Sequence, residues 1–260
     1  MPELPDVEEF RRILASCATG RRVERVEVAD AGVLRGVTAR RLRQRLTGRT
    51  FTEPRRHGKW LLAPTEGPTV LFHFGMTGRL RCDPADSSPA PHDRVTLVLD
   101  DGHRLRYRDQ RKLRGIWFAA TAADADRLLA DQGPDALALA PGELAELLAG
   151  QRRRVKAALL DQSTVAGLGN LLADEILWHA RVHPARRAVD LGDDERRRVD
   201  SATRQVLRAA VPTGHVPAKR SWLTARRDTP APHCPRCDTP LRQSRVAGRT
   251  TLWCPACQPE

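Results

Sequence analysis

The chain has 260 residues and a mass of 28.9 kDa, enough for one large domain or two modest domains with an appendage. Its 44 Lys and Arg outnumber 32 Asp and Glu, and the net charge of +12 favours a polyanionic partner. No apolar run reaches the roughly 18 residues that a membrane helix needs, which excludes a helical span. Residues 1–6 lack the basic and apolar stretches of a secretory signal, so we expect a cytoplasmic protein.

The N-terminal part of the chain is predicted to be rich in β-structure. Residues 5–17 carry apolar side chains at helical spacing, residues 23–29 are rich in valine as in a strand, and residues 38–46 have the pattern of a short helix. Short segments, several of them alternating apolar and polar residues, follow at 60–63, 69–74, 95–100, 105–108 and 116–119. This texture is typical of an antiparallel sheet. We therefore predict that residues 1–122 form a β-sandwich domain with a helix attached at its N-terminus.

Beyond this part the pattern becomes helical. Apolar residues recur at spacings of three and four in the segments 124–131, 142–149, 154–161, 171–179 and 193–210. Residues 211–233 contain four prolines and several basic residues, and they are predicted to form a loop. We expect an all-helical domain over residues 123–225 and a small cysteine module over residues 226–260. Together the three parts make an α+β protein.

Four of the six cysteines form two Cys-x-x-Cys pairs: Cys234 with Cys237, and Cys254 with Cys257. Each pair directs two thiolates at one centre, and two pairs complete a tetrahedral Zn²⁺ site with no open position. The doubled spacing favours one structural zinc ion over a redox dithiol or two disulfides. Residues 240–253 are predicted to form a β-hairpin with Gly248 at its tip. The hairpin would present Arg245 and Arg249, either to phosphate oxygens or simply to solvent.

Residues 160–175 combine the end of one helix with a glycine-rich entry into the next. Gly167 and Gly169 allow backbone amides to approach an anion closely, and a helix start adds free N–H groups and a positive dipole end. Asn170 can cap this helix or donate its amide to a phosphate. With Lys156 one helix earlier, the pattern favours a phosphate-binding site over an ordinary corner between two helices.

The first residues of the chain offer a reactive group. Pro2 follows Met1, and removal of the initiator methionine would leave Pro2 with a free secondary amine. Because an α-amino group titrates at about pH 7.7–8.0, part of it is neutral and nucleophilic at neutral pH. Attack of this amine on the anomeric carbon of a sugar would give an iminium ion, with Glu3 as acid or base. Many unrelated chains begin with Met-Pro-Glu, so this pattern needs support from the rest of the sequence.

Five motifs in the same order resemble the Fpg/Nei family of bifunctional DNA glycosylases, over nearly the whole chain. They are Pro2–Glu8, Arg56–Leu62, His73–Gly78, Asp161–Gln162 with Gly167–Glu175, and Gly248–Cys254. The resemblance implies a helix–two-turn–helix motif in the helical domain and a C-terminal zinc hairpin with one structural Zn²⁺. It also implies a monomer whose partner is double-stranded DNA with damaged bases or abasic sites.

The resemblance implies catalytic roles for Pro2, Glu3 and Lys59. Pro2 would attack the anomeric carbon, Glu3 would protonate the ring oxygen, and Lys59 would hold a phosphate beside the lesion. Flipping of the damaged base is required, because the reacting bond is inaccessible inside a stacked duplex. Successive β- and δ-elimination would then cut the strand on both sides of the sugar.

Five further residues are expected to bind DNA: Lys156, Asn170, Arg249, Met76 and Arg111. Arg249 and Asn170 would hold phosphates, and Lys156 matches a family lysine near the site. Met76 and Arg111 would fill the space that the flipped base leaves. Two segments depart from the family pattern. Asp109–Gly115 is one residue longer and has Leu113 where phenylalanine is usual, and residues 211–233 are short compared with the loop that caps an oxidised purine.

These features predict a base-excision-repair glycosylase with AP lyase activity that removes oxidised or ring-opened bases. A non-catalytic protein that binds damaged DNA would keep the zinc hairpin and the helical motif, but it would not need Pro2, Glu3 and Lys59. A specialised glycosylase for bulky adducts or crosslinks is compatible with the short segment 211–233.

Several other residues receive a structural interpretation. Cys17 and Cys82 are isolated in the sequence and are expected to be buried, unreactive thiols. His73 is interpreted as a core histidine without a catalytic role. Asp174 and Glu175 are interpreted as groups on a helix surface or at a helix cap, with the alternative that Glu175 orients the flipped nucleotide.

Overall fold

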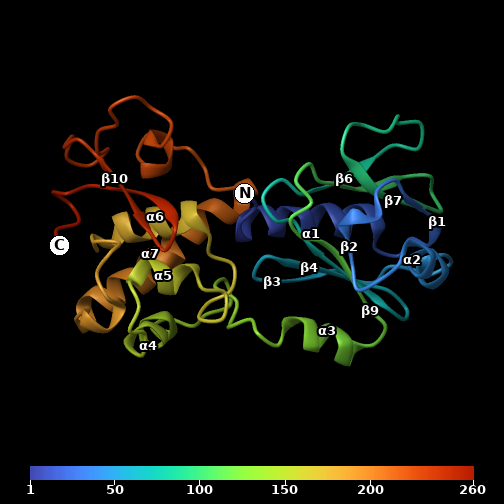
Figure 1. Ribbon diagram of the computed structural model, residues 1–260, viewed down its shortest axis with the longest axis horizontal. Coiled ribbons are helices and arrows are strands. Elements are labelled where there is room, and N and C mark those ends of the chain that lie inside the picture. The colour runs from blue at the N-terminus through green and yellow to red at the C-terminus, as the bar shows by residue number, and fades with distance from the viewer. The chain divides into compact units, whose positions relative to one another are not determined.

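The computed structural model describes residues 1–260, which form two compact units (Figure 1). The first unit comprises Met1–Pro2 and Asp6–Ala130, and the second comprises Glu3–Pro5 and Asp131–Glu260. The first is a β-sandwich with an attached helix, and the second joins helices to a C-terminal β-hairpin with four cysteines. The predicted α+β class is therefore confirmed, whereas the division into residues 1–122, 123–225 and 226–260 stays a prediction.

The first unit contains most of the strands. Its helices are α1 (Leu4–Ala18), of which Leu4 and Pro5 belong to the second unit, α2 (Ala39–Leu46) and α3 (Ala122–Leu129), with the 3₁₀ turn η1 (Ala31–Val33). Its strands are β1 (Val23–Val28), β2 (Leu34–Arg35), β3 (Arg55–His57), β4 (Trp60–Pro64), β5 (Thr69–His73), β6 (Arg79–Asp83), β7 (Asp93–Leu99), β8 (Arg104–Arg108) and β9 (Gly115–Ala119). The elements predicted in this part are confirmed. Sequence patterns missed β2 and β3 because they are two and three residues long, and β6 because only Leu80 and Cys82 of its five residues are apolar.

Two sheets form the sandwich. One has the strand order β1-β7-β8-β6 and the other β2-β9-β5-β4-β3, and all pairs are antiparallel except β2 with β9. The core between the sheets includes Val26 and Leu97 from the first and Phe72 from the second. The five-stranded sheet is buried on its other face as well, because Trp60 and Leu71 pack there against α3. Successive residues of its central strands therefore face two different apolar surfaces.

The second unit is helical before its C-terminal hairpin. Its helices are α4 (Glu143–Ala149), α5 (Val155–Leu160), α6 (Asn170–Ala180) and α7 (Asp193–Ala210), with the 3₁₀ turns η2 (Ala188–Asp190), η3 (Val211–Thr213) and η4 (Leu223–Arg226). Its strands are β10 (Arg242–Val246) and β11 (Arg249–Trp253). The predicted helices and hairpin are confirmed. The core of this unit gathers apolar side chains from α4, α5, α6 and α7, among them Leu148, Leu159, Ile176 and Val206. None of the helices is both long and apolar enough to cross a membrane.

A disulfide joins Cys17 at the end of α1 to Cys82 in β6. The interpretation of these two residues as separate free thiols is therefore wrong. Sequence separation hides the pair, since the two cysteines are 65 positions apart and only the sandwich topology brings them together. The bond fixes the C-terminal end of α1 to an outer strand of the four-stranded sheet.

Removal of this disulfide in the double variant Cys17→Ser/Cys82→Ser is expected to lower the free energy of unfolding by about 2–4 kcal/mol, because a long loop is no longer closed in the unfolded chain. Urea unfolding of the native and variant proteins, each with and without reductant, measures the effect. Reductant should destabilise the native protein and leave the variant unchanged. Native protein with the same unfolding midpoint in both conditions would contradict the prediction.

Candidate active site

Glu3 is a buried carboxylate bound to the start of helix α6. The residue is 1% exposed. Its Oε2 accepts hydrogen bonds from the backbone N–H groups of Gly169 at 3.0 Å and Leu172 at 3.1 Å, and its Oε1 accepts one from Leu171 at 2.8 Å. N–H groups in the first turn of a helix have no partner inside the helix, and the helix dipole favours a negative charge beside them. Glu3 thus fixes the N-terminal peptide, and Pro2 precedes it by one peptide bond.

Two glycines in the turn before α6 make room for this attachment. A Cβ on Gly169 would lie 2.2 Å from Cδ of Glu3, and a Cβ on Gly167, where φ is +113°, would lie 2.6 Å from Cδ1 of Leu4. Leu4 also donates its backbone N–H to the Gly167 carbonyl at 3.1 Å. The Gln162 side chain supports the turn, because its Oε1 accepts the Gly167 N–H at 3.0 Å. Any larger residue at either glycine would displace the N-terminal peptide.

The anion at this glycine-rich turn is part of the chain itself. The sequence pattern predicts a bound phosphate here, whereas the N–H groups of Gly169, Leu171 and Leu172 bind the Glu3 carboxylate. The pattern correctly indicates an anion at the helix start. It cannot indicate the source, because Glu3 and Gly169 are 166 positions apart in the sequence. A phosphate contact by the Asn170 side chain stays a prediction.

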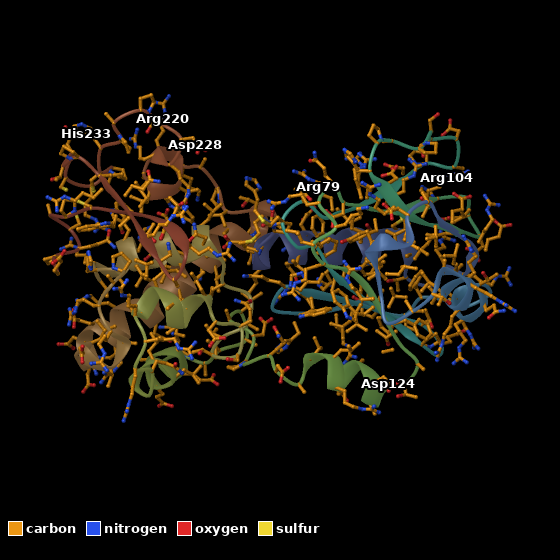
Figure 2. All side chains as sticks on the ribbon, in the orientation of Figure 1. Arg79, Arg104, Asp124, Arg220, Asp228 and His233 are labelled. Carbon is orange, nitrogen blue, oxygen red and sulfur yellow. A yellow bond between two sulfur atoms is a disulfide. The ribbon has the colours of Figure 1, made fainter.

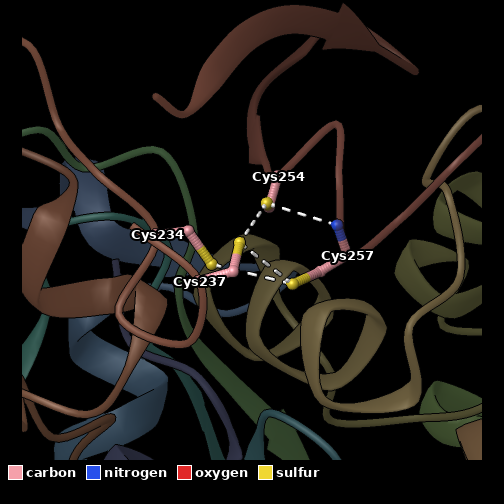
Figure 3. Close-up of side chains that lie close together, drawn as sticks. All are labelled: Cys234, Cys237, Cys254 and Cys257. Carbon is pink, nitrogen blue, oxygen red and sulfur yellow. Dashed lines mark hydrogen bonds between the residues drawn. The ribbon is translucent and has the colours of Figure 1, made fainter. Parts of the chain in front are cut away.

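The four C-terminal cysteines converge on one centre (Figure 3). Their sulfur atoms all lie within 4.8 Å of one another, with Cys237 Sγ at 3.5 Å from the sulfurs of both Cys254 and Cys257. Sulfurs bonded at about 2.3 Å to a tetrahedral zinc ion are about 3.8 Å apart, so the cluster fits such an ion. The predicted metal ligands are thus brought together, and the cluster can hold a metal ion. Trp178 of α6 donates its Nε1–H to Cys234 Sγ at 3.4 Å and so attaches the cluster to the helices.

The hairpin β10–β11 is held at one carbonyl group, next to the exposed Arg249. The Thr250 carbonyl accepts hydrogen bonds from three side chains: Arg227 Nη2 at 2.7 Å, Asn170 Nδ2 at 3.0 Å and Lys156 Nζ at 3.3 Å. These donors come from the segment after η4, from α6 and from α5. The arrangement fixes the backbone beside Arg249 while the Arg249 side chain remains accessible.

Lys156 is fully buried, at 0% exposure. Its Nζ lies 2.5 Å from Asp174 Oδ1 and 2.7 Å from Thr251 Oγ1. Asp174 also accepts a hydrogen bond from Arg227 Nη1 at 2.7 Å on its other oxygen. Burial lowers the pKa of the Lys156 ammonium, and the Asp174 carboxylate opposes that shift. In this structure Lys156 supports the hairpin from within the protein, so the direct DNA contact predicted for it stays a prediction.

Breaking the buried pair from either side is expected to be costly. Asp174→Asn should lower the free energy of unfolding by about 3 kcal/mol, because it leaves the buried Lys156 ammonium without its nearest counter-charge. Lys156→Met should lower it by less, because Asp174 keeps its ion pair with Arg227. The double variant should lose less than the sum of the two single variants, because neither charge is then buried alone. Urea unfolding of the four proteins gives the coupling energy. Strictly additive losses would mean that the two groups do not support each other.

Asp174 and Glu175 do not lie on a helix surface, so that interpretation is wrong. Glu175 is 0% exposed and binds η4, where it accepts the N–H groups of Leu223 at 3.2 Å and Thr224 at 3.0 Å. Arg227 is a further functional residue, for which the predicted loop 211–233 gives no signal. The sequence of α6 does carry a signal for the burial of Asp174 and Glu175. Apolar residues surround the whole helix, so acidic residues within it must be buried and paired.

Lys59 lies in the tight turn between β3 and β4, beside Gly58 with its φ of +56°. Arg56 braces this turn, because its Nη1 donates to the Gly58 carbonyl at 3.0 Å. The same guanidinium places Nε at 3.1 Å from Oε2 of Glu8 in α1. The helix that continues from the N-terminal peptide therefore supports the turn that carries Lys59.

Met76 and Arg111, predicted to fill the space of a flipped base, lie side by side. Arg111 Nη1 is 3.0 Å from the Met76 sulfur. A buried carboxylate organises both segments, because Asp109 Oδ1 accepts Thr77 Oγ1–H at 2.6 Å and the Arg111 backbone N–H at 3.1 Å. Leu113 in the same loop is 51% exposed. The fold of the first unit thus brings one thioether, one guanidinium and one aliphatic side chain together on two hydrogen-bonded loops, residues 74–78 and 109–115, which form a double loop.

His73 has the structural role expected from the sequence. Its Nδ1 accepts the Gly75 N–H at 3.1 Å, and its ring packs edge-on against Trp60 at 5.0 Å. Burial, together with the positive charges of Arg114 and Lys59, lowers the pKa of His73 to about 4. The imidazole is therefore neutral at pH 7.

Comparison with known proteins agrees with this geometry. Residues 1–116 match the family model described as the formamidopyrimidine-DNA glycosylase N-terminal domain, and residues 132–220 match the formamidopyrimidine-DNA glycosylase H2TH domain. The formamidopyrimidine-DNA glycosylase of Geobacter sulfurreducens is 38% identical over 273 residues, which cover 99% of this chain and 100% of the relative. The chain belongs to the formamidopyrimidine-DNA glycosylase family.

Two solved structures extend the comparison to DNA complexes. Lactococcus lactis Fpg in complex with DNA that contains an abasic site is 27% identical, with a TM-score of 0.89 and complete coverage of both chains. Wild-type Lactococcus lactis Fpg in complex with DNA that contains N7-benzyl-Fapy-dG is 28% identical, again with a TM-score of 0.89 and complete coverage of both chains. The Lactococcus lactis protein therefore shares the fold of this chain, and in these two structures it is bound to DNA with an abasic site or a modified base.

Proposed function

We propose that this protein is a DNA glycosylase that removes oxidised or ring-opened bases from double-stranded DNA and then cleaves the strand as an AP lyase through Pro2. The observation that supports the chemistry best is the attachment of Glu3, because three backbone N–H groups fix the residue directly after Pro2. A free amine on a fixed peptide is pre-positioned for attack, which reduces the entropy cost of a covalent step.

The proposed reaction begins once Met1 has been removed. The Pro2 nitrogen forms a bond to the anomeric carbon while the glycosidic bond to the damaged base breaks, and the base leaves with a proton. As the base leaves, the sugar ring opens and its oxygen takes a proton from Glu3, whose carboxylate has first taken up a proton from solvent, and an iminium ion results. Loss of an adjacent sugar proton then expels the 3′ phosphate by β-elimination, and δ-elimination expels the 5′ phosphate.

The DNA-binding residues are proposed to act on the two sides of the lesion. Lys59, Asn170 and Arg249 would hold phosphates, since each is at least partly exposed on a turn, a helix start or a hairpin tip. Met76 and Arg111 would enter the space left by the flipped base, which their double loop presents together. We propose a monomer that acts in the cytoplasm on the nucleoid, where its substrate lies.

Structural neighbours that bind a bulky lesion favour a second candidate. The Lactococcus lactis complex with N7-benzyl-Fapy-dG shows a similar protein bound to a base with a large substituent. In the present chain the segment 211–233 contains only the short turns η3 and η4. We therefore include bulky ring-opened purines in the proposed substrate range.

The proposed function is tested on a panel of duplexes that contain 8-oxoguanine, a formamidopyrimidine, an N7-alkylated formamidopyrimidine, an oxidised pyrimidine or an abasic site. Base release and strand cleavage are measured separately for each duplex. We expect release of the damaged base from each duplex with a purine lesion. We also expect strand cleavage at the abasic site, whether it is present from the start or formed by base release. Tight binding to the lesions without base release would instead indicate a non-catalytic protein that recognises damage.

We further propose that the four-cysteine cluster holds one structural Zn²⁺, and that its removal weakens DNA binding. Protein stripped of metal, or the variant Cys237→Ser, should bind an abasic duplex about tenfold or more weakly, because the segment that carries Arg249 loses its support. Metal analysis of the purified protein should find one zinc ion per chain. Metal-free protein with native affinity would contradict the role of the cluster.

A further inference from the structure

A cavity of about 400 Å³ opens on the first unit beside the helix α3. Its walls come from the edge strand β2, the helix α2, the strand β9 and α3. The lining residues used below are Arg35, Arg41, Trp117, Phe118, Asp124 and Arg127, and Asp124 is labelled on α3 in Figure 2. The volume lies within the range of small-ligand sites. None of the residues of the candidate active site lines this cavity.

The cavity combines an aromatic wall with an excess of positive charge. Trp117 is partly exposed, and Trp60 packs against it edge-on at 4.7 Å between ring centroids, which holds the indole in place. Three arginines and one carboxylate face the space, so its net charge is +2. Arg127 has a side chain that is 76% exposed and pairs with Asp124 at 3.1 Å, whereas Arg41 is exposed and makes no ion pair.

The basic character continues along α2. Residues 31–52 contain six arginines and no acidic residue, although the whole chain has 32 Asp and Glu. Arg41 and Arg45 are four positions apart in α2. They therefore lie on the same face of the helix, with their Cβ atoms about 6 Å apart. A strand whose phosphate meets Arg41 could therefore reach a second cation with its next phosphate. A small anion would need only one of them.

We propose that this cavity binds an unpaired nucleotide of a single strand of nucleic acid, with the base against Trp117 and the phosphates on Arg41 and Arg127. Aromatic platforms beside arginines are the usual means of binding single strands without sequence preference, because every base has a π-face. Arg35 connects the cavity to the loop Asp109–Gly115, since its Nη2 donates to the Lys112 carbonyl at 2.9 Å. An occupied cavity would thus lie next to the loop that carries Arg111.

The test uses the full-length protein with its lesion site filled by an unlabelled duplex that carries a stable abasic analogue. A labelled thymidine strand of about ten nucleotides with one 5-iododeoxyuridine is then added, and both its affinity and its photo-crosslinks are measured. We expect crosslinks within the tryptic peptide of residues 115–127, which contains Trp117 and Phe118. We also expect the double variant Arg41→Glu/Arg127→Glu to bind the strand at least tenfold more weakly, with a smaller salt dependence.

The control is Arg208→Glu, the same charge reversal at an exposed arginine of α7 in the second unit, which should leave the affinity unchanged. Crosslinks only outside residues 115–127, or equal affinity for the native protein and the double variant, would overturn the proposal. If thymidine monophosphate competes as strongly as the strand, the proposal of a single-strand site is overturned, and the result indicates a site for a free nucleotide. The same variants should excise the base from a lesion duplex at the native rate. A failure of the single-strand proposal can therefore be distinguished from a failure of the proposed glycosylase function, on which it does not depend.

Discussion

Protein that keeps Met1 is expected to lose strand cleavage at an abasic site by about 10³-fold or more, the order of loss seen when a covalent nucleophile is removed. The reason is chemical, because the Pro2 nitrogen is then part of an amide and its lone pair is delocalised. Pro2→Gly should lose about 10²-fold or more. It keeps an N-terminal amine but lacks the ring that fixes the backbone. Single-turnover cleavage of an abasic duplex measures all three proteins.

Duplex affinity serves as the control for this result. Neither change removes a contact of Glu3, so binding to a stable abasic analogue should stay within about threefold of the native value. Equal cleavage rates for the native and Met1-retaining proteins would contradict a role for the N-terminal amine. Loss of binding in parallel with cleavage would mean that the changes disturb the fold instead of the chemistry.

Glu3 variants are expected to produce the second large effect, and to separate two roles of one side chain. Glu3→Gln should reduce base release by about 10²-fold or more, because an amide cannot transfer a proton as a carboxyl group does. Cleavage of a duplex that is already abasic should fall less. Glu3→Ala should in addition lower the free energy of unfolding by about 3 kcal/mol, because three N–H groups at the start of α6 lose their acceptor.

A matched control lies in α1, the helix that begins directly after Glu3. Glu9 in α1 is partly exposed and pairs with Arg12 at 3.4 Å, so Glu9→Gln should change neither base release nor stability by a measurable amount. If Glu3→Gln were as active as the native protein, the proposed proton transfer would be wrong and only the attachment role would remain. If Glu3→Ala were as stable as the native protein, the attachment itself would be in doubt.

The sequence predicted those features whose signals are local. Apolar spacing identified α1, α6 and α7, and the spacing of Cys234, Cys237, Cys254 and Cys257 identified the four-cysteine cluster. Turn chemistry identified the glycines before α6. In each case a short run of residues carries the whole physical requirement, such as helical period or ligand spacing.

Pairings between distant positions could not be predicted in this way. The disulfide between Cys17 and Cys82 and the bond from Glu3 to Gly169 depend on the fold, which alone brings these residues together. Lys156 illustrates the same limit, because neither the family resemblance nor its place before the glycine-rich turn indicates its buried pairing with Asp174. The predicted DNA contact of Lys156 stays a prediction. A charged residue within an apolar helix is better interpreted first as a buried, paired group.

The most direct test of the proposed mechanism is borohydride trapping of the native protein on an abasic duplex, followed by mass spectrometry of the tryptic peptides. Reduction fixes the iminium ion as a stable amine. The mechanism predicts that the sugar remnant is attached to the N-terminal peptide of residues 2–11, at the Pro2 nitrogen. An adduct on Lys59 or another lysine, or no adduct under conditions where the duplex is cleaved, would contradict it.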